Sequence, residues 1–437
     1  MRLFFNSAQR LESVDFKIFN IIGLKEPFGG PVFLAVSIFT SIGMLMLFLG
    51  SDHGLLEFDK GLGELGIEDF AAFYRGGQLA LEGNAALAYD YQHFASVFSE
   101  SNEELLFLNP PQAFLFFEPL AHLPYPVARA VGIVLNSVAI IGLVYSLRLN
   151  LGITPYVLTV LSCGAYFSFS ILQISPIFIF LLVFALINHR KMPLLSGVAL
   201  AIATIKPQFG LLVPVFLISV RSWPVFAYAA FGTLFLFFLT LAVYGSSVWE
   251  AFFSSISAGG HSTQLWDAFA PMITISHSLG KLGASDTVKM AGQVLVMMCC
   301  TVLVWFSGRK LSVDRSLPVV VFAMCIASPS FILYDWLLVS VGLLLLLRCK
   351  PRWTVLLQVL GGIVGAAPLI QAALGFIDWE TVRKFSAFVP LLMISVCGLM
   401  LRELTNGMPR IEGAKAAREF GAGFDSKPFT HSADFTS

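Results

Sequence analysis

Charge is scarce in this sequence, and neither sign is in excess. Charged residues make up only 12% of the chain, against about 25% in ordinary soluble domains. Lysine plus arginine equals aspartate plus glutamate at 27 each, so the net charge predicts no partner. Hydrophobic residues reach 57% and phenylalanine alone counts 42. This combination excludes an ordinary soluble enzyme, a disordered protein and a nucleic-acid binder.

Cysteines are few as well, and they form no recognisable site. None of the six has metal-ligand spacing, and no loop carries a pair suited to a disulfide. We expect them to be small apolar packing residues. The sequence also has no glycine-rich phosphate loop, metal-binding cluster or nucleophile elbow. It therefore predicts neither a cofactor nor a metal site.

Long apolar runs dominate the chain. The first is 31–50, which at about 1.5 Å per residue can cross a hydrocarbon core of about 30 Å. About twelve such runs predict an all-α polytopic membrane protein. Residues 1–30 lack a small-residue cleavage site and are expected to be a cytoplasmic segment rather than a signal peptide. The membrane domain is 31–402, and 403–437 is expected to be a poorly ordered polar tail. The other runs are 127–147, 154–170, 172–188, 192–205, 207–220, 224–244, 290–307, 317–333, 335–349, 354–373 and 385–402.

The loop charges predict the orientation. Cytoplasmic loops carry excess lysine and arginine. With alternate loops counted from a cytoplasmic N-terminus, every short basic cluster falls on the cytoplasmic side, which also holds the C-terminus. The long loop 51–126 is then extracytoplasmic, with twelve acidic and two basic residues, and so is 245–289. The inside cations are Arg148, Arg190, Lys191, Arg221, Arg309, Lys310, Arg315, Arg348, Lys350, Arg352, Arg402 and Arg410.

Two pairs of neighbouring runs contain members that are short for a membrane span: 192–205 with 207–220, and 317–333 with 335–349. Each pair is either a hairpin with a sunken tip or one long kinked span. The second option would place Arg221 outside, against the positive-inside pattern. Irregular backbone at membrane depth survives where it is buried in protein or lines a cavity. We therefore expect hairpins whose tips face a cavity open to the outer side.

Polar residues gather on this predicted outer side. Ionisable residues at membrane depth are costly and are functional candidates by default, so their convergence predicts an active site or binding cavity at the outer leaflet. The candidates are Asp69, Arg75, Gln173, Lys206, Gln208, His261, Tyr334 and Asp335.

Several strings along the chain carry a family resemblance. From Asp69 the first outer loop reads DFAAFYRGGQLALEGNAALAYD, and from Asn109 it reads NPPQAFLFFEPLAHLP. The Gln173 turn, IKPQFGLL and ASPSFILYDWLL follow in order. Together these segments resemble glycosyltransferase family 87, over about residues 31–350. The resemblance implies a membrane glycosyltransferase with the GT-C fold and a large first extracytoplasmic loop carrying short helices.

The resemblance also implies a reaction. The donor is a sugar, mannose in the best-known branch, on a polyprenyl phosphate at the outer face of a bacterial inner membrane. The acceptor is a lipid or a glycan. An acidic residue of the first outer loop deprotonates the acceptor hydroxyl, which displaces the lipid phosphate with inversion. The matching carboxylate here is Asp69.

The residues themselves agree with this role for Asp69. It precedes an apolar, helix-like stretch, and a carboxylate held against aromatic surface is a better base. The structural alternative is an N-cap for that helix. Glu68 is the main rival as base and Asp59 a distant one.

Cationic and hydrogen-bonding groups are needed to stabilise a leaving phosphate. Lys206, a lone cation at a hairpin tip, is the leading candidate, although it could instead snorkel to the interface. Arg75 could hold the phosphate or a loop carboxylate such as Glu82. His261 and His277 are weaker candidates, because a single loop histidine is more often structural.

One position departs from the family pattern. The mannosyltransferase branch tends to carry a His-His pair after the second hairpin's Ser-Pro, and this sequence has Tyr334-Asp335 there. Asp335 could grip sugar hydroxyls, pair with a cation or cap its helix. The departure predicts either that Lys206 carries more of the phosphate binding or that the substrate differs from mannose.

Two other classes compete with the enzyme. A polytopic transporter or flippase would show internal repeats around a midplane site, and no repeat is found. A purely structural membrane component would not need polar hairpin tips. Convergence of the polar residues near an interface favours the enzyme, and convergence at the midplane favours the carrier.

Overall fold

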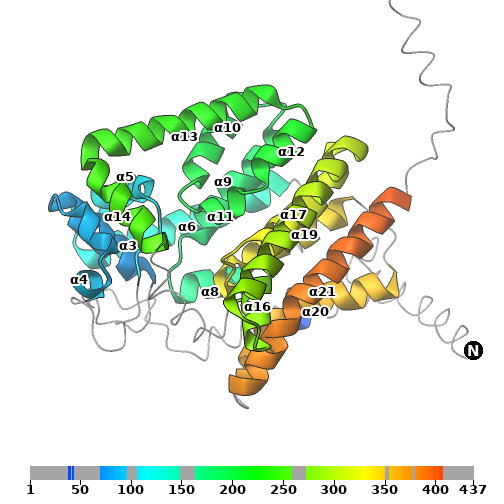
Figure 1. Cartoon of the computed structure of the whole chain (residues 1–437). Coiled ribbons are helices and arrows are strands. Elements are labelled where there is room, and N and C mark those ends of the chain that lie inside the picture. Colours follow the sequence, from blue (N-terminus) through cyan, green and yellow to red (C-terminus); the bar gives the residue numbers. More distant parts are fainter. Residues whose placement is uncertain are drawn as a thin grey trace, which may run out of the picture.

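The computed structural model describes residues 38–40, 42–43, 69–95, 106–147, 163–257, 272–349, 354–375 and 379–406. All regular elements within these ranges are helical, so the predicted all-α class is confirmed for them. The helices form an elongated bundle with a group of short helices at one end (Figure 1).

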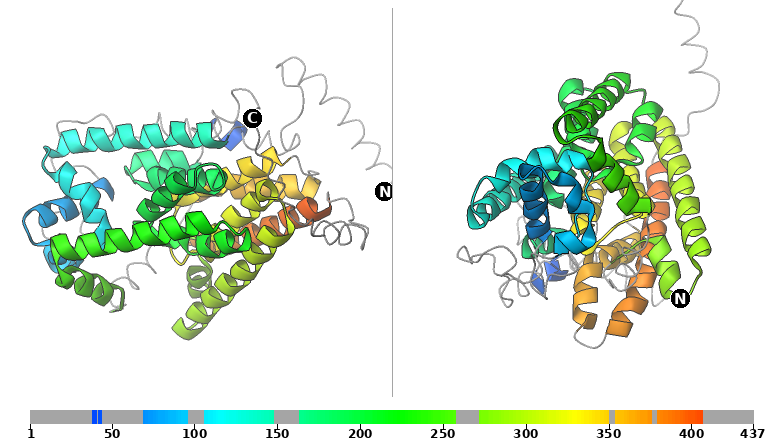
Figure 2. Two further views of the ribbon diagram at one scale, coloured as in Figure 1. Left: turned by 90° about the horizontal axis from the view of Figure 1, so that it is seen from above. Right: turned by 60° about the vertical axis from the view of Figure 1, so that its left-hand side comes forward.

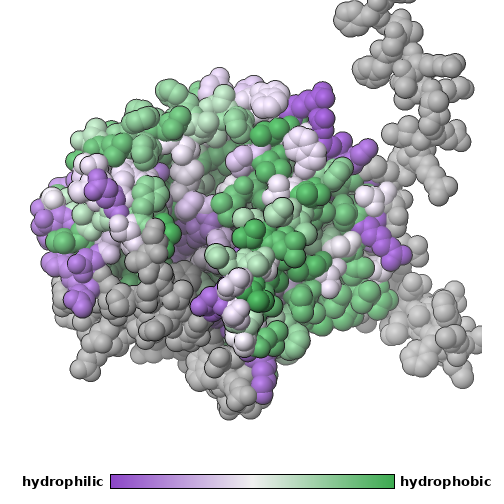
Figure 3. Space-filling model, viewed as in Figure 1, coloured by the Kyte–Doolittle hydropathy of each residue, from purple (hydrophilic) through white to green (hydrophobic). Residues whose placement is uncertain are grey.

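Five of the described helices are long and apolar enough to cross a membrane. Helix α13 is the most exposed of them, with only 11% of its apolar window buried. Such an apolar surface is stable only in a lipid environment, and Figure 3 shows hydrophobic residues across the middle of the visible face. The protein is therefore a membrane protein. The five helices are α6 (Tyr125–Leu147), α13 (Trp223–Tyr244), α17 (Asp286–Lys310), α20 (Val355–Gly375) and α21 (Trp379–Asn406).

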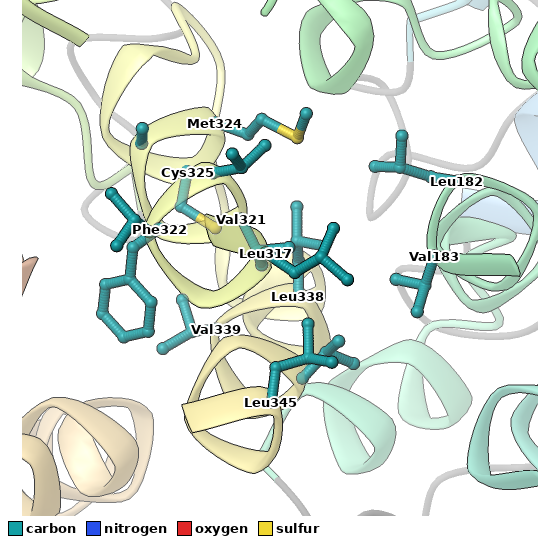
Figure 4. Close-up of a cluster of buried hydrophobic side chains, with 14 of the residues drawn as sticks. Leu182, Val183, Leu317, Val321, Phe322, Met324, Cys325, Leu338, Val339 and Leu345 are labelled. Atoms are coloured by element: carbon teal, nitrogen blue, oxygen red, sulfur yellow. The ribbon is translucent and has the colours of Figure 1, made fainter. Parts of the chain in front are cut away.

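Shorter apolar helices fill the interior of the bundle. Helices α18 and α19 are buried along most of their length, and Figure 4 shows Leu317 and Leu338 on the side toward Leu182 and Val183 of α9, with Phe322 and Val339 on the far side. A helix that is hydrophobic on every side belongs in a core. These shorter helices are α8 (Cys163–Ser170), α9 (Ser175–Asn188), α10 (Pro193–Ala203), α11 (Pro207–Gly210), α12 (Val213–Ser219), α18 (Val313–Ala327) and α19 (Trp336–Arg348).

Both short pairs of runs return to the end of the bundle from which they start. Arg190 before α10 and Arg221 after α12 line one pocket, so this segment doubles back. Asp314 at the start of α18 is bonded to Arg348 at the end of α19, 2.9 Å apart. These contacts match the predicted hairpins rather than two long kinked spans.

The predicted basic clusters also share one end of the bundle. Arg190, Arg221, Arg309 and Lys310 lie around a single pocket. We call this the basic end. Hydrophilic residues gather there at the upper right of Figure 3.

The opposite end carries a group of short helices, here called the cap (Figure 2). The cap has a hydrophobic core of its own. Phe70, Phe114 and Phe117 fill this second core, together with Leu172 and Ile205 from turns of the bundle. The short helices expected in the first outer loop are therefore present in its described part. The cap comprises α3 (Asp69–Leu81), η1 (Ala85–Tyr89), α4 (Tyr91–Ala95), η3 (Pro111–Ala113), α5 (Phe114–Ala121) and α14 (Ser246–Ser257).

Two further elements complete the described chain. Helix α16 (Ile275–Lys281) follows α14, and η4 (Leu333–Asp335) forms the tip between α18 and α19. This tip is braced because Ile273 N–H donates to the Phe331 carbonyl, at 2.9 Å. The Gln293 side chain of α17 donates to the Ser328 carbonyl, at 3.2 Å.

Several sequence predictions lie partly or wholly outside the described residues. These include the segment 1–30, most of the run 31–50, and the tail beyond 406. The count of twelve spans therefore stays a prediction. Helix α21 continues to Asn406, past the expected boundary at 402.

Candidate active site

Asp69 lies at the junction between the cap and the bundle. It is the first residue of α3, and its backbone N–H donates to the Ile171 carbonyl at 2.9 Å. This bond fixes the start of α3 against the turn between α8 and α9. The Asp69 carboxylate accepts a hydrogen bond from Gln173 Nε2, 2.5 Å from Oδ2. The base predicted from the sequence and the predicted polar turn are thus in direct contact.

Gln173 is itself held rigidly. Its side-chain oxygen accepts from the Ile174 N–H at 2.9 Å, which orients its amide nitrogen toward Asp69. Its backbone carbonyl accepts from the Asn136 side chain of α6, at 2.8 Å. A donor fixed in this way requires little reorganisation when charge changes on its partner.

The two hairpin tips meet beside this pair. Lys206 Nζ lies 3.7 Å from Asp335 Oδ1. Ser175, the first residue of α9, bridges them: its hydroxyl accepts from Lys206 at 2.6 Å and donates to Asp335 at 2.7 Å. Lys206 and Asp335 are only 4% and 1% exposed. Lys206 therefore points inward and does not snorkel to the interface.

Asp335 satisfies its second oxygen locally. Oδ2 accepts from the Ile332 N–H at 3.3 Å, which closes the tight turn of η4. Of the alternatives considered for Asp335, pairing with a cation is found, whereas its side chain makes no capping hydrogen bond at the start of α19.

Tyr334 lies over the lysine. The Lys206 ammonium is 4.9 Å from the centre of the Tyr334 ring, within the range of a cation–π interaction. The Tyr334 hydroxyl interacts with the Gln173 side chain, and the Asp69 charge acts on both Tyr334 and Lys206. The five predicted polar residues from four chain segments thus form one electrostatic unit.

Exposure divides this unit into a rim and a floor. Asp69 and Tyr334 are half-buried, whereas Gln173, Lys206 and Asp335 are buried beneath them. Within the described ranges Lys206 makes one hydrogen bond, to Ser175, so its ammonium retains donors for a further acceptor. The arrangement offers an accessible carboxylate above a fixed cation.

The remaining candidates lie elsewhere. Arg75 forms an ion pair with Glu82, 3.5 Å away. Of the two roles considered for Arg75, it therefore holds a loop carboxylate. Gln208 is half-buried in α11, and among the described residues it makes no hydrogen bond to this cluster. His277 is buried at the start of α16, where its N–H bonds to Thr274. His261, Glu68 and Asp59 lie outside the described residues.

Two members of the site were missed by the sequence analysis. Ser175 precedes a proline at a helix start, where a serine resembles an ordinary N-terminal residue. Asn136 lies in the middle of an apolar run, and a buried polar residue at that depth was the signal that could have found it. In the part of the chain that the structure describes, no three His, Cys, Asp or Glu side chains could hold a metal ion.

Fold and site together define a helical membrane protein with a buried polar cluster where the bundle meets its cap. Residues 107–329, about half of the chain, match glycosyltransferase family 87. The chain belongs to this family, and it is a membrane glycosyltransferase that uses a sugar donor and an acceptor. The match includes Gln173, Ser175 and Lys206 and ends before Tyr334. Comparison with curated proteins and with solved structures finds no match.

Proposed function

We propose that the protein transfers a sugar, mannose as the leading candidate, from a polyprenyl phosphate to a hydroxyl of a lipid or glycan acceptor. The observation that carries this proposal is the half-buried Asp69 carboxylate, bonded to Gln173 at 2.5 Å, with Lys206 near enough for its charge to interact with that of Asp69. A transferase of this kind needs a base at the acceptor and a cation at the phosphate. Both groups lie at one junction, where an acceptor and a lipid can meet.

In the proposed reaction the acceptor O–H gives its proton to Asp69. The oxygen then forms a bond to the anomeric carbon from the side opposite the phosphate. The bond between that carbon and the phosphate oxygen breaks, and the phosphate leaves with the electron pair. Attack from the opposite side inverts the configuration. Polyprenyl phosphate is the second product.

Lys206 and Tyr334 are proposed to hold the leaving phosphate. Lys206 has N–H donors left after its bond to Ser175, and Tyr334 lies half-buried above it. Asp335 offsets part of the lysine charge, because the two groups are 3.7 Å apart. We therefore propose that phosphate binds through hydrogen bonds from an ammonium whose charge is partly offset, where the mannosyltransferase branch has two histidines.

The cap favours an enzyme over a transporter, because a group of helices outside the spanning bundle offers a face for an acceptor. The Asp69 and Gln173 pair lies under this cap, and Gln173 is also bonded to Asn136 in the middle of α6. We propose that the cap end faces the periplasm of a bacterial inner membrane, with both termini cytoplasmic, and that the fold is of the GT-C type. The basic end then lies in the cytoplasm, as the positive-inside rule requires.

The test is transfer of labelled mannose from polyprenyl-phosphate-mannose to extracted membrane lipids and glycans. The wild type is compared with Asp69→Asn, and with Asp286→Asn as a control, since Asp286 is 94% exposed at the start of α17. We expect Asp69→Asn to lose about 100-fold or more in rate and Asp286→Asn to be unchanged. Equal rates in the wild type and Asp69→Asn would remove Asp69 as the base and make Glu68 the next candidate.

A donor panel and a chelator complete the experiment. If mannose is not transferred, other polyprenyl-phosphate sugars test whether Tyr334-Asp335 marks a different substrate. We propose that no metal takes part, so EDTA should leave the rate unchanged. Movement of lipid-linked sugar across vesicles without transfer to any acceptor would support the transporter instead.

A further inference from the structure

A second polar site lies at the basic end, far from Asp69. A pocket of about 550 Å³ opens there between three segments: the loop after α9, the end of α12 with its turn, and the last turns of α17. Gln293, near the cap-facing tip, and Arg309 are separated on α17 by about 24 Å of helix. The pocket is lined by Arg190, Ser219, Val220, Arg221, Trp305, Phe306, Gly308, Arg309 and Lys310.

Four of these nine residues are cations, and none is an acid. Some cations elsewhere among the described residues have carboxylate partners, as in Lys206 with Asp335 or Arg348 with Asp314. Within the described ranges the four pocket cations have no carboxylate partner, although Arg309 stacks on Trp305 at 5.6 Å. Like charges brought together without a counter-charge repel one another, so a concentration of this kind favours an anionic ligand.

The pocket is braced rather than formed by loosely placed side chains. A side chain at Gly308 would collide with Ser219, so α17 and α12 are in direct contact here. Ser222 is bonded to His189 at 2.9 Å, which ties the turn after α12 to the loop after α9. Arg221 has φ of 55°, a left-handed conformation that costs a non-glycine residue energy. These contacts fix the backbone segments that carry the four cations, whose side chains are exposed.

One wall of the pocket is apolar and open. Trp305 and Phe306 are 38% and 55% exposed, and they continue the apolar surface of α17 that also exposes Met298 and Val302. A soluble phosphate compound would make no favourable contact with such a wall. A lipid would, because its acyl chains can lie along α17 while its headgroup reaches the cations.

We propose that this pocket binds the headgroup of an anionic phospholipid, and that two phosphodiester groups, as in cardiolipin, suit it best. The topology bias alone places cations at this end of the bundle. This bias does not explain why cations from three separate segments line the same pocket. Four positive charges exceed a single phosphodiester, so charge complementarity favours a headgroup with two.

The experiment uses the full chain, delipidated in neutral detergent. Cardiolipin, phosphatidylglycerol, phosphatidylcholine and inorganic pyrophosphate are added separately, and binding is followed by native mass spectrometry and by the melting temperature. The test variant is the double substitution Arg309→Gln with Lys310→Gln. The matched control is Lys191→Gln with Arg402→Gln, which removes two exposed cations outside the pocket lining.

We expect cardiolipin to bind the wild type and the control variant equally, and to bind the pocket variant about thirtyfold more weakly. Equal melting temperatures without added lipid show that the pocket variant folds. If both double variants lose the same affinity, the effect is general surface charge and the proposal is wrong. If pyrophosphate stabilises the wild type as well as cardiolipin does, the ligand is a soluble phosphate compound and the lipid assignment is overturned.

Discussion

Lys206 and Asp335 come from the tips of two separate hairpins, and their charged atoms are 3.7 Å apart with the Ser175 hydroxyl bonded to both. Both side chains are almost fully buried. A buried pair of this kind contributes little net stability, but the loss of one partner leaves an uncompensated charge. The contact therefore fixes the relative position of the two tips.

Removing either member alone should destabilise the protein strongly. We expect Lys206→Met and Asp335→Leu each to cost about 3–5 kcal/mol, and the double substitution to cost much less than their sum. Melting temperatures of the four proteins in one detergent give the coupling. Sugar transfer separates structure from chemistry: the double variant should fold and yet be inactive. Full activity in that variant would contradict a role of Lys206 at the phosphate.

Gln173 is expected to act as a positioning residue for Asp69. Its amide donates to the Asp69 carboxylate at 2.5 Å, and a lost donor disfavours the ionised carboxylate. In Gln173→Leu the acid limb of kcat/KM against pH should therefore move to higher pH. At high pH the rate of Gln173→Leu should be reduced relative to the wild type by less than the rate of Asp69→Asn is. Gln208→Leu is the control, because it alters a nearby glutamine outside the bonded cluster. An unshifted profile would mean that Gln173 serves only the fold.

The packing of α8 on α19 should tolerate no added methyl group. A side chain at Gly164 would meet the backbone of Leu337 and Trp336, directly after the Tyr334–Asp335 tip. We expect Gly164→Ala to cost about 3 kcal/mol and to lower transfer. Gly210→Ala is the matched control, since nothing lies within 4 Å of a methyl group there. Similar melting temperatures for the two variants would show that α8 can move away without penalty.

His189 should make the fold sensitive to acid. Burial, with the nearby Arg190 charge as a second cause, lowers the pKa of His189 to about 4 from its usual 6.5. The folded protein thus disfavours the protonated ring, so stability is full above pH 6.5 and is lost as the pH falls toward 4. His189→Gln stays neutral and should flatten the melting temperature over that range. Parallel curves for the two proteins would remove His189 as the cause.

The helical class, the hairpins and the shared basic end follow from hydropathy and loop charge. The sequence also predicts that four site residues meet at one end of the bundle, because an odd number of predicted spans precedes each of their loops. These residues are Asp69, Gln173, Lys206 and Asp335. The sequence does not predict which of these side chains contact one another. The number of preceding spans predicts only the end of the bundle, whereas a 3.7 Å contact depends on helix tilt and packing. Ser175 was missed for this reason, since its role exists only once both tips have reached it.

Arg75 shows how the structure decides between two options that the sequence left open. It lies close to Asp69 in the sequence, which made it a candidate for the same phosphate. Six residues on a helix turn a side chain by about 240°, so the two face different directions. In the structure Arg75 forms an ion pair with Glu82 instead. Spacing on a helix therefore carries more information than distance along the chain.

The Lys206–Asp335 pair has a consequence for biosynthesis. Lys206 leaves the ribosome about 130 residues before Asp335, which at about 5–20 residues per second is a delay on the order of 10 s. During that interval the first hairpin must enter the bilayer with an ammonium whose carboxylate partner has not yet been made. Ser175 has already been synthesised, but its hydroxyl can accept only one hydrogen bond from the ammonium and does not balance its charge. The insertion machinery must then hold the first hairpin beside water or beside its own polar groups until the second arrives.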